Sequence, residues 1–215
     1  MSPPDGRAPP FVACLDGFLP PAGCAEILRE LRFTRWRPSA VVARDGDGVL
    51  RSGRTWRRRS ETATADWFVA PLLDLVADLE RRIEATFGVA PERFEGWQAT
   101  RFGETDGYDF HLDAGGYANE PGGEREWTFL LFLDTPAAGG GTAFRHLDRT
   151  YEASAGRLLA WRNLTEGGAP DERLLHAATP VTAGTKTTLM TWARQRAVRP
   201  DPSDPTIGTR AEATT

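Results

Sequence analysis

Hydrophobic residues recur with a helical period in two stretches of the N-terminal part of the chain. Each stretch carries one apolar stripe with spacings of three and four residues, which predicts an amphipathic helix. The stripes consist of Cys24, Ile27, Leu28 and Leu31, and of Leu72, Val76, Leu79 and Ile83. We expect Thr64 or Asp66 to cap the second helix and Gly88 to end it, because these residue types favour those positions. Ahead of both helices, Phe11–Phe18 is typical of a strand that leads into a turn.

After Gly88 the pattern changes to short runs of aromatic and aliphatic residues. Gly, Pro, Asp and Asn separate the runs, as is typical of strands joined by turns. The runs are Trp97–Phe102, Tyr108–Asp113, Trp127–Leu133, Thr142–Arg145, Arg157–Trp161, Leu174–Ala178 and Lys186–Arg194. Helices followed by many short strands predict an α+β protein. We expect a double-stranded β-helix (jelly roll) core with the N-terminal helices packed on one sheet.

The length of 215 residues suits one domain, which we place at residues 11–196. Residues 1–10 are rich in proline, and we expect them to be flexible. Residues 197–215 have little apolar content, and we expect a disordered tail there.

Composition and charge exclude several classes of function. The formal net charge is −4, so the chain as a whole has no electrostatic footprint for nucleic acid. No apolar run approaches the roughly 20 residues that a membrane-spanning helix needs. The N-terminus lacks the pattern of a signal peptide, so we expect a cytoplasmic protein. Cys14 and Cys24 then predict two buried thiols rather than a disulfide.

The candidate chemistry lies in His111, Asp113 and His176. Residues two apart in a strand point to the same face, so His111 and Asp113 aim an imidazole and a carboxylate at one point. His176, from a distant strand, completes two histidines and one carboxylate on one face of a metal. Such a set leaves positions open for a co-substrate and O₂, which is typical of non-haem iron(II) oxygenases.

A second His-Leu-Asp tripeptide, His146 to Asp148, offers a rival ligand pair. Three or four predicted strands separate Asp113 from His176, enough to wrap a roll and bring two strands face to face. Only about one predicted strand separates Asp148 from His176. The first tripeptide is therefore the better candidate, and His146 is expected to be a partly exposed histidine near a turn.

Lys186 follows the last ligand by ten residues, at the start of a strong strand. We expect a hairpin of residues 174–179 and 186–192 to place Lys186 near the metal, where it could hold the far carboxylate of 2-oxoglutarate. Tyr108 precedes His111 by three residues, so strict alternation would put it on the opposite face. Gly107 makes local twisting easy, and Tyr108 could then offer a hydroxyl to the co-substrate.

Two segments are candidates for the substrate side of the site. The glycine-rich run of residues 114–126 is expected to be a mobile loop that could act as a lid. Five arginines crowd residues 51–59, and such a run is usually a solvated face. Alternation projects Arg57 and Arg59 to one side and Arg58 to the other. If the run reaches the pocket, we expect Arg54, Trp56 and Arg57 to contact a substrate with an anionic group.

Together these segments resemble the prolyl 4-hydroxylase-like branch of the iron(II)/2-oxoglutarate-dependent dioxygenase superfamily. The resemblance covers about residues 11–194 and is specific in the combination of its motifs. The matching segments are residues 98–102, 108–113, 127–134, 140–144, 156–163, 175–177, 180–181, 184–186 and Trp192.

The resemblance implies Fe(II), 2-oxoglutarate as co-substrate and O₂. It implies that His111, Asp113 and His176 bind the iron and that Lys186 binds the distal carboxylate of 2-oxoglutarate. It also places Thr142 and Trp192 along the co-substrate pocket. The sequence departs from the family at Phe102, where a Tyr often contacts 2-oxoglutarate.

We therefore expect an iron(II) oxygenase that hydroxylates an unactivated C–H bond. The compact size favours a small molecule or an amino-acid-derived intermediate as substrate, and a prolyl or other peptidyl substrate is the alternative. Two further alternatives are a non-catalytic jelly-roll binding module and a zinc hydrolase with the same three ligands. Neither requires a buried cation ten residues after the last ligand.

Overall fold

Two antiparallel sheets lie one above the other in the computed structural model, which describes residues 11–44, 46–47 and 49–200. The larger sheet has seven strands, in the order β1 (Val12–Leu15), β13 (Leu158–Arg162), β9 (Arg125–Phe132), β16 (Lys186–Arg194), β7 (Gln98–Phe102), β6 (Glu61–Thr64) and β2 (Arg37–Pro38). The smaller sheet has five, in the order β12 (Arg149–Tyr151), β11 (Thr142–Phe144), β14 (His176–Ala178), β8 (Gly107–His111) and β5 (Arg58–Arg59). This is the jelly-roll arrangement that the strand pattern predicts.

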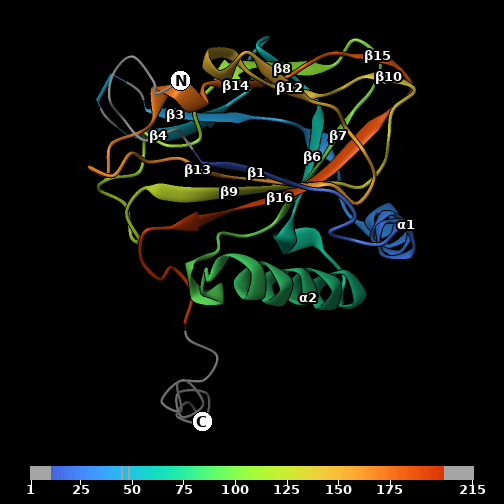
Figure 1. Ribbon diagram of the computed structural model, residues 1–215, viewed down its shortest axis with the longest axis horizontal. Helices are drawn as coiled ribbons and strands as arrows, with labels where there is room; N and C mark the ends of the chain where they lie inside the picture. The colour runs from blue at the N-terminus through green and yellow to red at the C-terminus, as the bar shows by residue number, and fades with distance from the viewer. Residues whose placement is uncertain (1–10, 45, 48, 201–215) are drawn as a thin grey trace, which may run out of the picture.

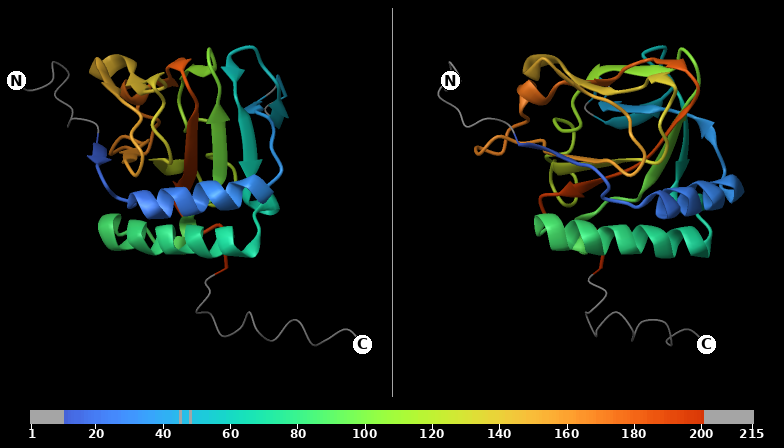
Figure 2. Two further views of the ribbon diagram at one scale, coloured as in Figure 1. Left: turned by 90° about the vertical axis from the view of Figure 1, so that its right-hand side faces the viewer. Right: turned by 45° about the vertical axis from the view of Figure 1, so that its right-hand side comes forward.

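Two short ribbons and two helices complete the fold. The ribbons pair β3 (Val41–Arg44) with β4 (Leu50–Gly53), and β10 (Ala138–Gly139) with β15 (Val181–Ala183). The helices α1 (Pro21–Glu30) and α2 (Ala70–Phe87) lie side by side against the outer face of the larger sheet (Figures 1 and 2). The molecule therefore has three layers, and the two sheets enclose the space between them.

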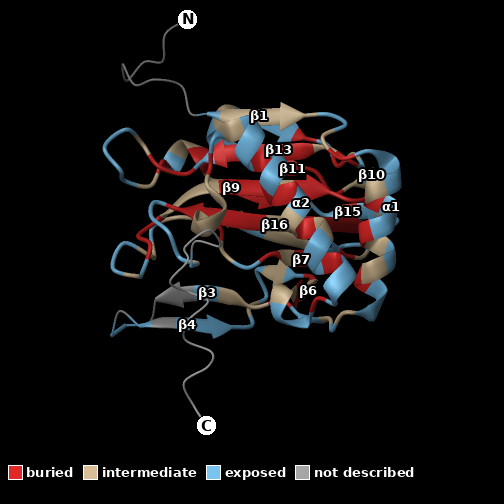
Figure 3. Cartoon of the chain, turned by 90° about the horizontal axis from the view of Figure 1, so that it is seen from below, coloured by how far each residue is buried: buried red, intermediate tan, exposed pale blue. Residues whose placement is uncertain are grey.

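Alternation along the strands of the larger sheet divides its side chains between two environments. In β16, Leu189 and Ala193 face the helices and are fully buried. The side chains at Lys186, Thr188, Met190 and Trp192 instead line a cavity between the sheets. Figure 3 shows β9, β13 and β16 as the buried centre of the molecule beneath α2. A period of two therefore places a lysine and a tryptophan on the same inner face.

The two predicted helices form, and one of the two predicted ends of the second helix is confirmed. Gly88 follows α2 with a left-handed backbone (φ 68°), a conformation that favours glycine. The predicted N-terminal caps are wrong, because α2 begins at Ala70 after Val69. Thr64 ends a strand and Asp66 lies in a 3₁₀ turn, so neither can cap the helix.

The strand pattern misses the segment between the helices and misplaces one connection. Residues 37–64 form β2 to β6, although this polar, arginine-rich stretch carries no clear strand signal. The predicted hairpin of residues 174–179 and 186–192 does not form. β14 and β16 belong to different sheets, and β15 lies between them in the chain. The predicted strand at residues 11–18 is shorter, at Val12–Leu15.

The ends of the chain are described only in part. Residues 1–10 and 201–215 lie outside the described residues, so the predictions of a flexible N-terminus and a disordered tail remain predictions there. Residues 197–200 are described, and the backbone N–H groups of Val198 and Arg199 both donate to the carbonyl of Glu92. Both cysteines are unpaired. Within the described ranges, no helix has the length and apolar character to cross a membrane.

Candidate metal centre

Three side chains with metal-ligand chemistry meet between the two sheets. His111 ends β8, His176 begins β14, and the two residues are paired across these neighbouring strands. Asp113 lies two residues beyond the end of β8. One ligand atom of each residue lies within 4.8 Å of the others. The Nε2 atoms of His111 and His176 are 3.8 and 3.6 Å from the carboxylate oxygens of Asp113. No other such group of three occurs among the described residues.

Backbone carbonyls orient both imidazoles. His111 donates its Nδ1 hydrogen to the carbonyl of Asp109 at 2.8 Å, and His176 donates to the carbonyl of Leu174 at 2.9 Å. A carbonyl oxygen can only accept, so the proton stands on Nδ1 and the Nε2 lone pair of each ring faces Asp113. This is the usual way in which a protein fixes the tautomer of a metal-binding histidine.

Asp113 is held from the opposite sheet. Thr128 on β9 donates a hydrogen bond of 2.7 Å to its Oδ2, and the amide of Asn163 donates to Thr128 at 2.9 Å. Burial alone would raise the pKa of Asp113, but His176, His111, Arg125 and the Thr128 hydroxyl together lower it. Burial, reinforced by His176, lowers the pKa of His111. An ionised carboxylate and a neutral imidazole are the protonation states that metal binding requires.

Two imidazoles and one carboxylate on one side of a cavity fit a metal with open positions. This donor set suits Fe(II), and the same three residue types also occur around zinc. The three donors alone therefore do not tell Fe(II) from zinc, and the groups around them decide which chemistry the site supports.

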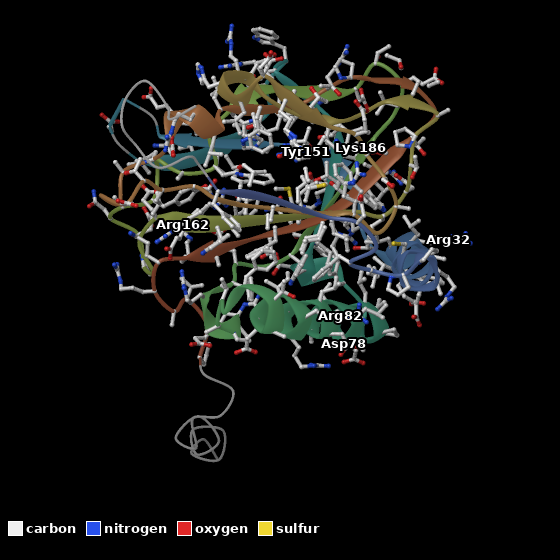
Figure 4. All side chains as sticks on the ribbon, viewed as in Figure 1. Arg32, Asp78, Arg82, Tyr151, Arg162 and Lys186 are labelled. Atoms are coloured by element: carbon white, nitrogen blue, oxygen red, sulfur yellow. The ribbon has the colours of Figure 1, made fainter. Side chains whose placement is uncertain are left out.

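Lys186 is the only lysine in the 215-residue sequence, and it is buried in the cavity. Figure 4 shows it between the two sheets. Its Nζ lies 4.9 Å from the ring centre of Phe102 and 5.4 Å from that of Phe132. Burial lowers the pKa of Lys186 to about 7, although Asp134 opposes this effect. Within the described residues, its ammonium makes no ion pair or hydrogen bond.

Two further buried polar groups in the cavity lack partners. Thr142 Oγ1 and Trp192 Nε1 are inaccessible and have no hydrogen bond within the described part of the chain. Unsatisfied buried groups are rare and usually indicate a missing ligand, ion or water. A cation, a hydroxyl and an indole N–H around a cavity of about 340 Å³ fit a small dicarboxylate such as 2-oxoglutarate.

Tyr108 lines the same cavity and stacks on His111. The ring centres are 3.7 Å apart and the planes differ by 20°. The pairing of β8 with β14 shifts between these two residues, because His111 pairs with His176 and Tyr108 with Ala178. Three residues of β8 thus span two of β14, a β-bulge that puts Tyr108 and His111 on one face. Phe102 also lines the cavity, and it is paired with Lys186 across β7 and β16.

The arginines expected to contact substrate lie outside this cavity. Arg54 and Arg57 line a neighbouring groove beside His111, and Arg57 pairs with Asp109 at 3.4 Å. Trp56 is 84% exposed. Arg58, on the opposite side of the same run, is the arginine that enters the cavity. The alternation along the strand predicts that Arg58 points to the opposite side from Arg57 and Arg59. It does not predict which of the two sides faces the cavity.

The rival tripeptide lies away from the centre. His146 is exposed in the 3₁₀ turn Arg145–Leu147, and Asp148 follows with a left-handed backbone (φ 46°). Neither residue lines the cavity.

Comparisons with known proteins agree with this geometry. The model of the 2OG-Fe(II) oxygenase superfamily matches residues 97–194. Human prolyl 4-hydroxylase subunit alpha-3 is 31% identical over 193 residues, which cover 86% of this chain and 34% of the human protein. Prolyl 4-hydroxylase subunit alpha-2 of Caenorhabditis elegans is 29% identical over 177 residues, or 80% of this chain and 32% of the worm protein. The chain thus spans about a third of the length of these relatives.

Solved structures share the fold. A prolyl-4-hydroxylase of Pseudomonas putida has a TM-score of 0.61 at 17% identity, covering 87% of this chain and 94% of that one. A viral collagen prolyl hydroxylase of Paramecium Bursaria Chlorella virus-1, solved as a 2OG complex, has a TM-score of 0.58 at 20% identity, covering 88% and 97%.

Proposed function

The chain belongs to the 2OG-Fe(II) oxygenase superfamily, and from this premise we propose that it is a hydroxylase of prolyl residues in peptides. The single observation that carries the oxygenase chemistry of this proposal is the buried, unpaired Lys186 in one cavity with His111, Asp113 and His176, and the relatives named above support the prolyl substrate. We assign the activity to one domain of residues 11–196.

In this proposal His111, Asp113 and His176 hold Fe(II). Bound Fe(II), together with 2-oxoglutarate and O₂, supplies the oxidising power needed to hydroxylate an unactivated C–H bond. The protein keeps both Nε2 lone pairs and the Asp113 carboxylate aimed at one point, and it excludes bulk water with aromatic walls. A carboxylate at position 113 fills the place that a halide needs in related halogenases, which argues for hydroxylation.

The co-substrate has its own set of residues. Lys186 binds the distal carboxylate, and Thr142 and Trp192 supply a hydroxyl and an indole N–H beside it. Phe102 contributes an apolar wall under the lysine in place of the hydroxyl that the family often has. Tyr108 holds the His111 ring by stacking and turns its own hydroxyl to the co-substrate. Burying a lysine costs free energy, and neither a zinc hydrolase nor a non-catalytic binding module requires a buried cation at this position.

The relatives named above support a prolyl residue in a peptide as the substrate. A specific observation supports a second candidate, a free small molecule with a carboxylate. The guanidinium of Arg58 lines the cavity, and its hydrogen-bond partners are neutral: Ser60, Ala40, Thr62 and Thr100. Burial lowers the pKa of Arg58, while Tyr108 and Asp113 oppose this. A buried cation with only neutral partners favours an anion, such as the carboxylate of a free amino acid.

The test compares the two substrate classes directly. The protein, loaded with Fe(II), is given 2-oxoglutarate and either a peptide of repeated Pro-Pro-Gly triplets or free L-proline and other free amino acids. We expect succinate formation coupled to the gain of one oxygen atom by the peptide, detected by mass spectrometry. Coupled turnover of free amino acids alone would replace the peptide by the second candidate. Absence of 2-oxoglutarate-dependent oxidation with either class would refute the proposal.

A further inference from the structure

The loop between β8 and β9 places one aromatic side chain in the cavity. We propose that Tyr117 is a specificity-determining residue, whose hydroxyl donates a hydrogen bond to a carbonyl of the substrate peptide beside the metal centre. This inference rests on the proposed function and names one of its substrate-binding groups. Tyr117 lines the cavity together with His111, Asp113 and His176.

Two guanidinium groups pack against the ring of Tyr117. The guanidinium carbons of Arg125 and Arg194 lie over its ring, each 4.4 Å from the ring centre. Such contacts are favourable because a cation is attracted to the electron-rich face of an aromatic ring. Arg125 also lies 3.6 Å from the ring centre of Trp192. With cations packed on its ring, Tyr117 is held at the wall of the cavity.

The two arginines are themselves fixed by one carboxylate. Arg125 donates two hydrogen bonds of 2.7 Å to Glu95, and Arg194 donates a third from its Nε. Burial alone would lower the pKa of Arg125, but the bonds to Glu95 raise it, so the guanidinium stays charged. The cations that hold Tyr117 therefore cannot swing toward Asp113 without leaving Glu95.

The backbone of the loop is also held. The buried carboxylate of Glu124 accepts hydrogen bonds from the N–H groups of Gly115 (3.0 Å) and Tyr117 (2.8 Å). Glu124 in turn exchanges two hydrogen bonds of 3.0 Å with Gln195, just after β16. These bonds tie the loop to the larger sheet, whereas its glycine content predicts a mobile lid. Tyr117 is therefore in position before a substrate arrives, which lowers the entropic cost of binding.

The hydroxyl of Tyr117 is available to bind a substrate. It has no hydrogen-bond partner among the described residues. Burial raises the pKa of Tyr117 although Arg125 opposes this effect, so the hydroxyl is protonated at neutral pH. A neutral donor beside the metal ligands suits a peptide carbonyl, which is a neutral acceptor.

The test separates the hydroxyl from the ring. Tyr117→Phe keeps the ring in contact with the two arginines and removes only the hydroxyl, whereas Tyr117→Leu removes both the ring and the hydroxyl. We expect Tyr117→Phe to raise the KM for the Pro-Pro-Gly peptide roughly ten-fold, the upper range for one neutral hydrogen bond. The KM for 2-oxoglutarate and the Tm should not change. Tyr151→Phe is the matched control, because Tyr151 packs on Phe144 in the core and does not line the cavity.

Each outcome decides the matter. If Tyr117→Phe binds the peptide as tightly as the parent protein and only Tyr117→Leu is impaired, the ring is a wall and the hydrogen bond does not exist. If Tyr117→Phe changes the KM for 2-oxoglutarate as much as that for the peptide, the residue does not select the substrate. If the parent protein oxidises no peptide, the proposed function fails first and this inference falls with it.

Discussion

At the scale of single residues, the metal centre depends on which histidines turn an Nε2 atom inward. His111 and His176 do so because backbone carbonyls take their Nδ1 hydrogens, whereas His146 lies exposed in a turn. We predict that His111→Ala or His176→Ala abolishes stoichiometric Fe(II) binding and that His146→Ala retains it. Metal content after anaerobic loading and desalting measures this. Loss of metal from a folded His146→Ala protein would show that the second tripeptide, not the first, binds the metal.

If Lys186 anchors 2-oxoglutarate as we propose, binding of this co-substrate depends on pH. Its pKa of about 7 means that the ammonium form, which binds a carboxylate, is already being lost just above neutrality. Above that pH the binding of 2-oxoglutarate must take up a proton, so the affinity should fall by up to about ten-fold for each pH unit. Below it, the affinity should be nearly constant until the co-substrate or its other partners titrate.

Calorimetry of 2-oxoglutarate binding to the Mn(II)-loaded protein, from about pH 6 to about pH 8.5, checks this prediction. Lys186→Arg is the control, because a guanidinium stays charged throughout this range and removes the slope. A parent protein whose affinity is flat across the range would mean that Lys186 is not the anchor.

At the scale of elements, the centre is assembled by strands from both sheets. β8 and β14 carry the ligands, while β9 of the opposite sheet reaches Asp113 through Thr128. We predict that Thr128→Val lowers the metal affinity by about 10- to 100-fold, the usual cost of losing a hydrogen bond to a metal ligand. Thr86→Val on the exposed face of α2 is the matched control, and metal titration of both variants is the measurement. Equal metal affinities in the two variants would show that the hydrogen bond from Thr128 does not support the metal centre.

The sequence predicts these elements where local pattern decides the structure. The pattern predicts a strand at Lys186–Arg194, and one forms with the same bounds, because the segment is rich in β-branched and apolar residues and is buried on both faces. Gly88 ends α2 because few other residues adopt its backbone conformation easily. The sequence likewise predicts the candidate ligands from their spacing and from the number of strands between them. The fold brings these ligands and Lys186 into one cavity.

Where long-range pairing decides, the pattern fails. The strands β2, β5 and β6 are short and polar and pair through the backbone with partners far along the chain, so they leave no periodic signal. The adjacency of residues 174–179 and 186–192 predicts a hairpin after His176, yet β14 and β16 belong to different sheets. The bulge that turns Tyr108 beside His111 depends on the register with β14, which no single strand encodes. The role of Arg58 depends on which side of β5 faces the cavity.

At the scale of the whole molecule, the layer between the larger sheet and the helices mainly supplies stability, and the space between the two sheets contains the candidate site. The space between the larger sheet and the helices is filled by apolar side chains such as Leu72, Phe129 and Leu189. The space between the sheets contains a second, smaller apolar cluster and also a cavity with a buried cation and unsatisfied polar groups, which cost stability. The apolar layer between the larger sheet and the helices therefore offsets the loss of stability that the polar cavity causes.

Lys186→Met tests this division, since methionine has a similar length and no charge. The pKa of Lys186 is lowered in the folded state, so between about pH 7 and its ordinary value of 10.5 the unfolded chain binds more protons than the folded one. The lysine therefore destabilises the fold fully below about pH 7, and this cost declines as the pH rises toward 10.5. We predict that Lys186→Met raises the Tm by several degrees at neutral pH, corresponding to a few kcal/mol. The gain should shrink at alkaline pH, and 2-oxoglutarate binding should be lost at every pH. Thermal unfolding of parent and variant across this range is the measurement, and an unchanged or lower Tm at neutral pH would contradict the view that this cavity is maintained at the expense of stability.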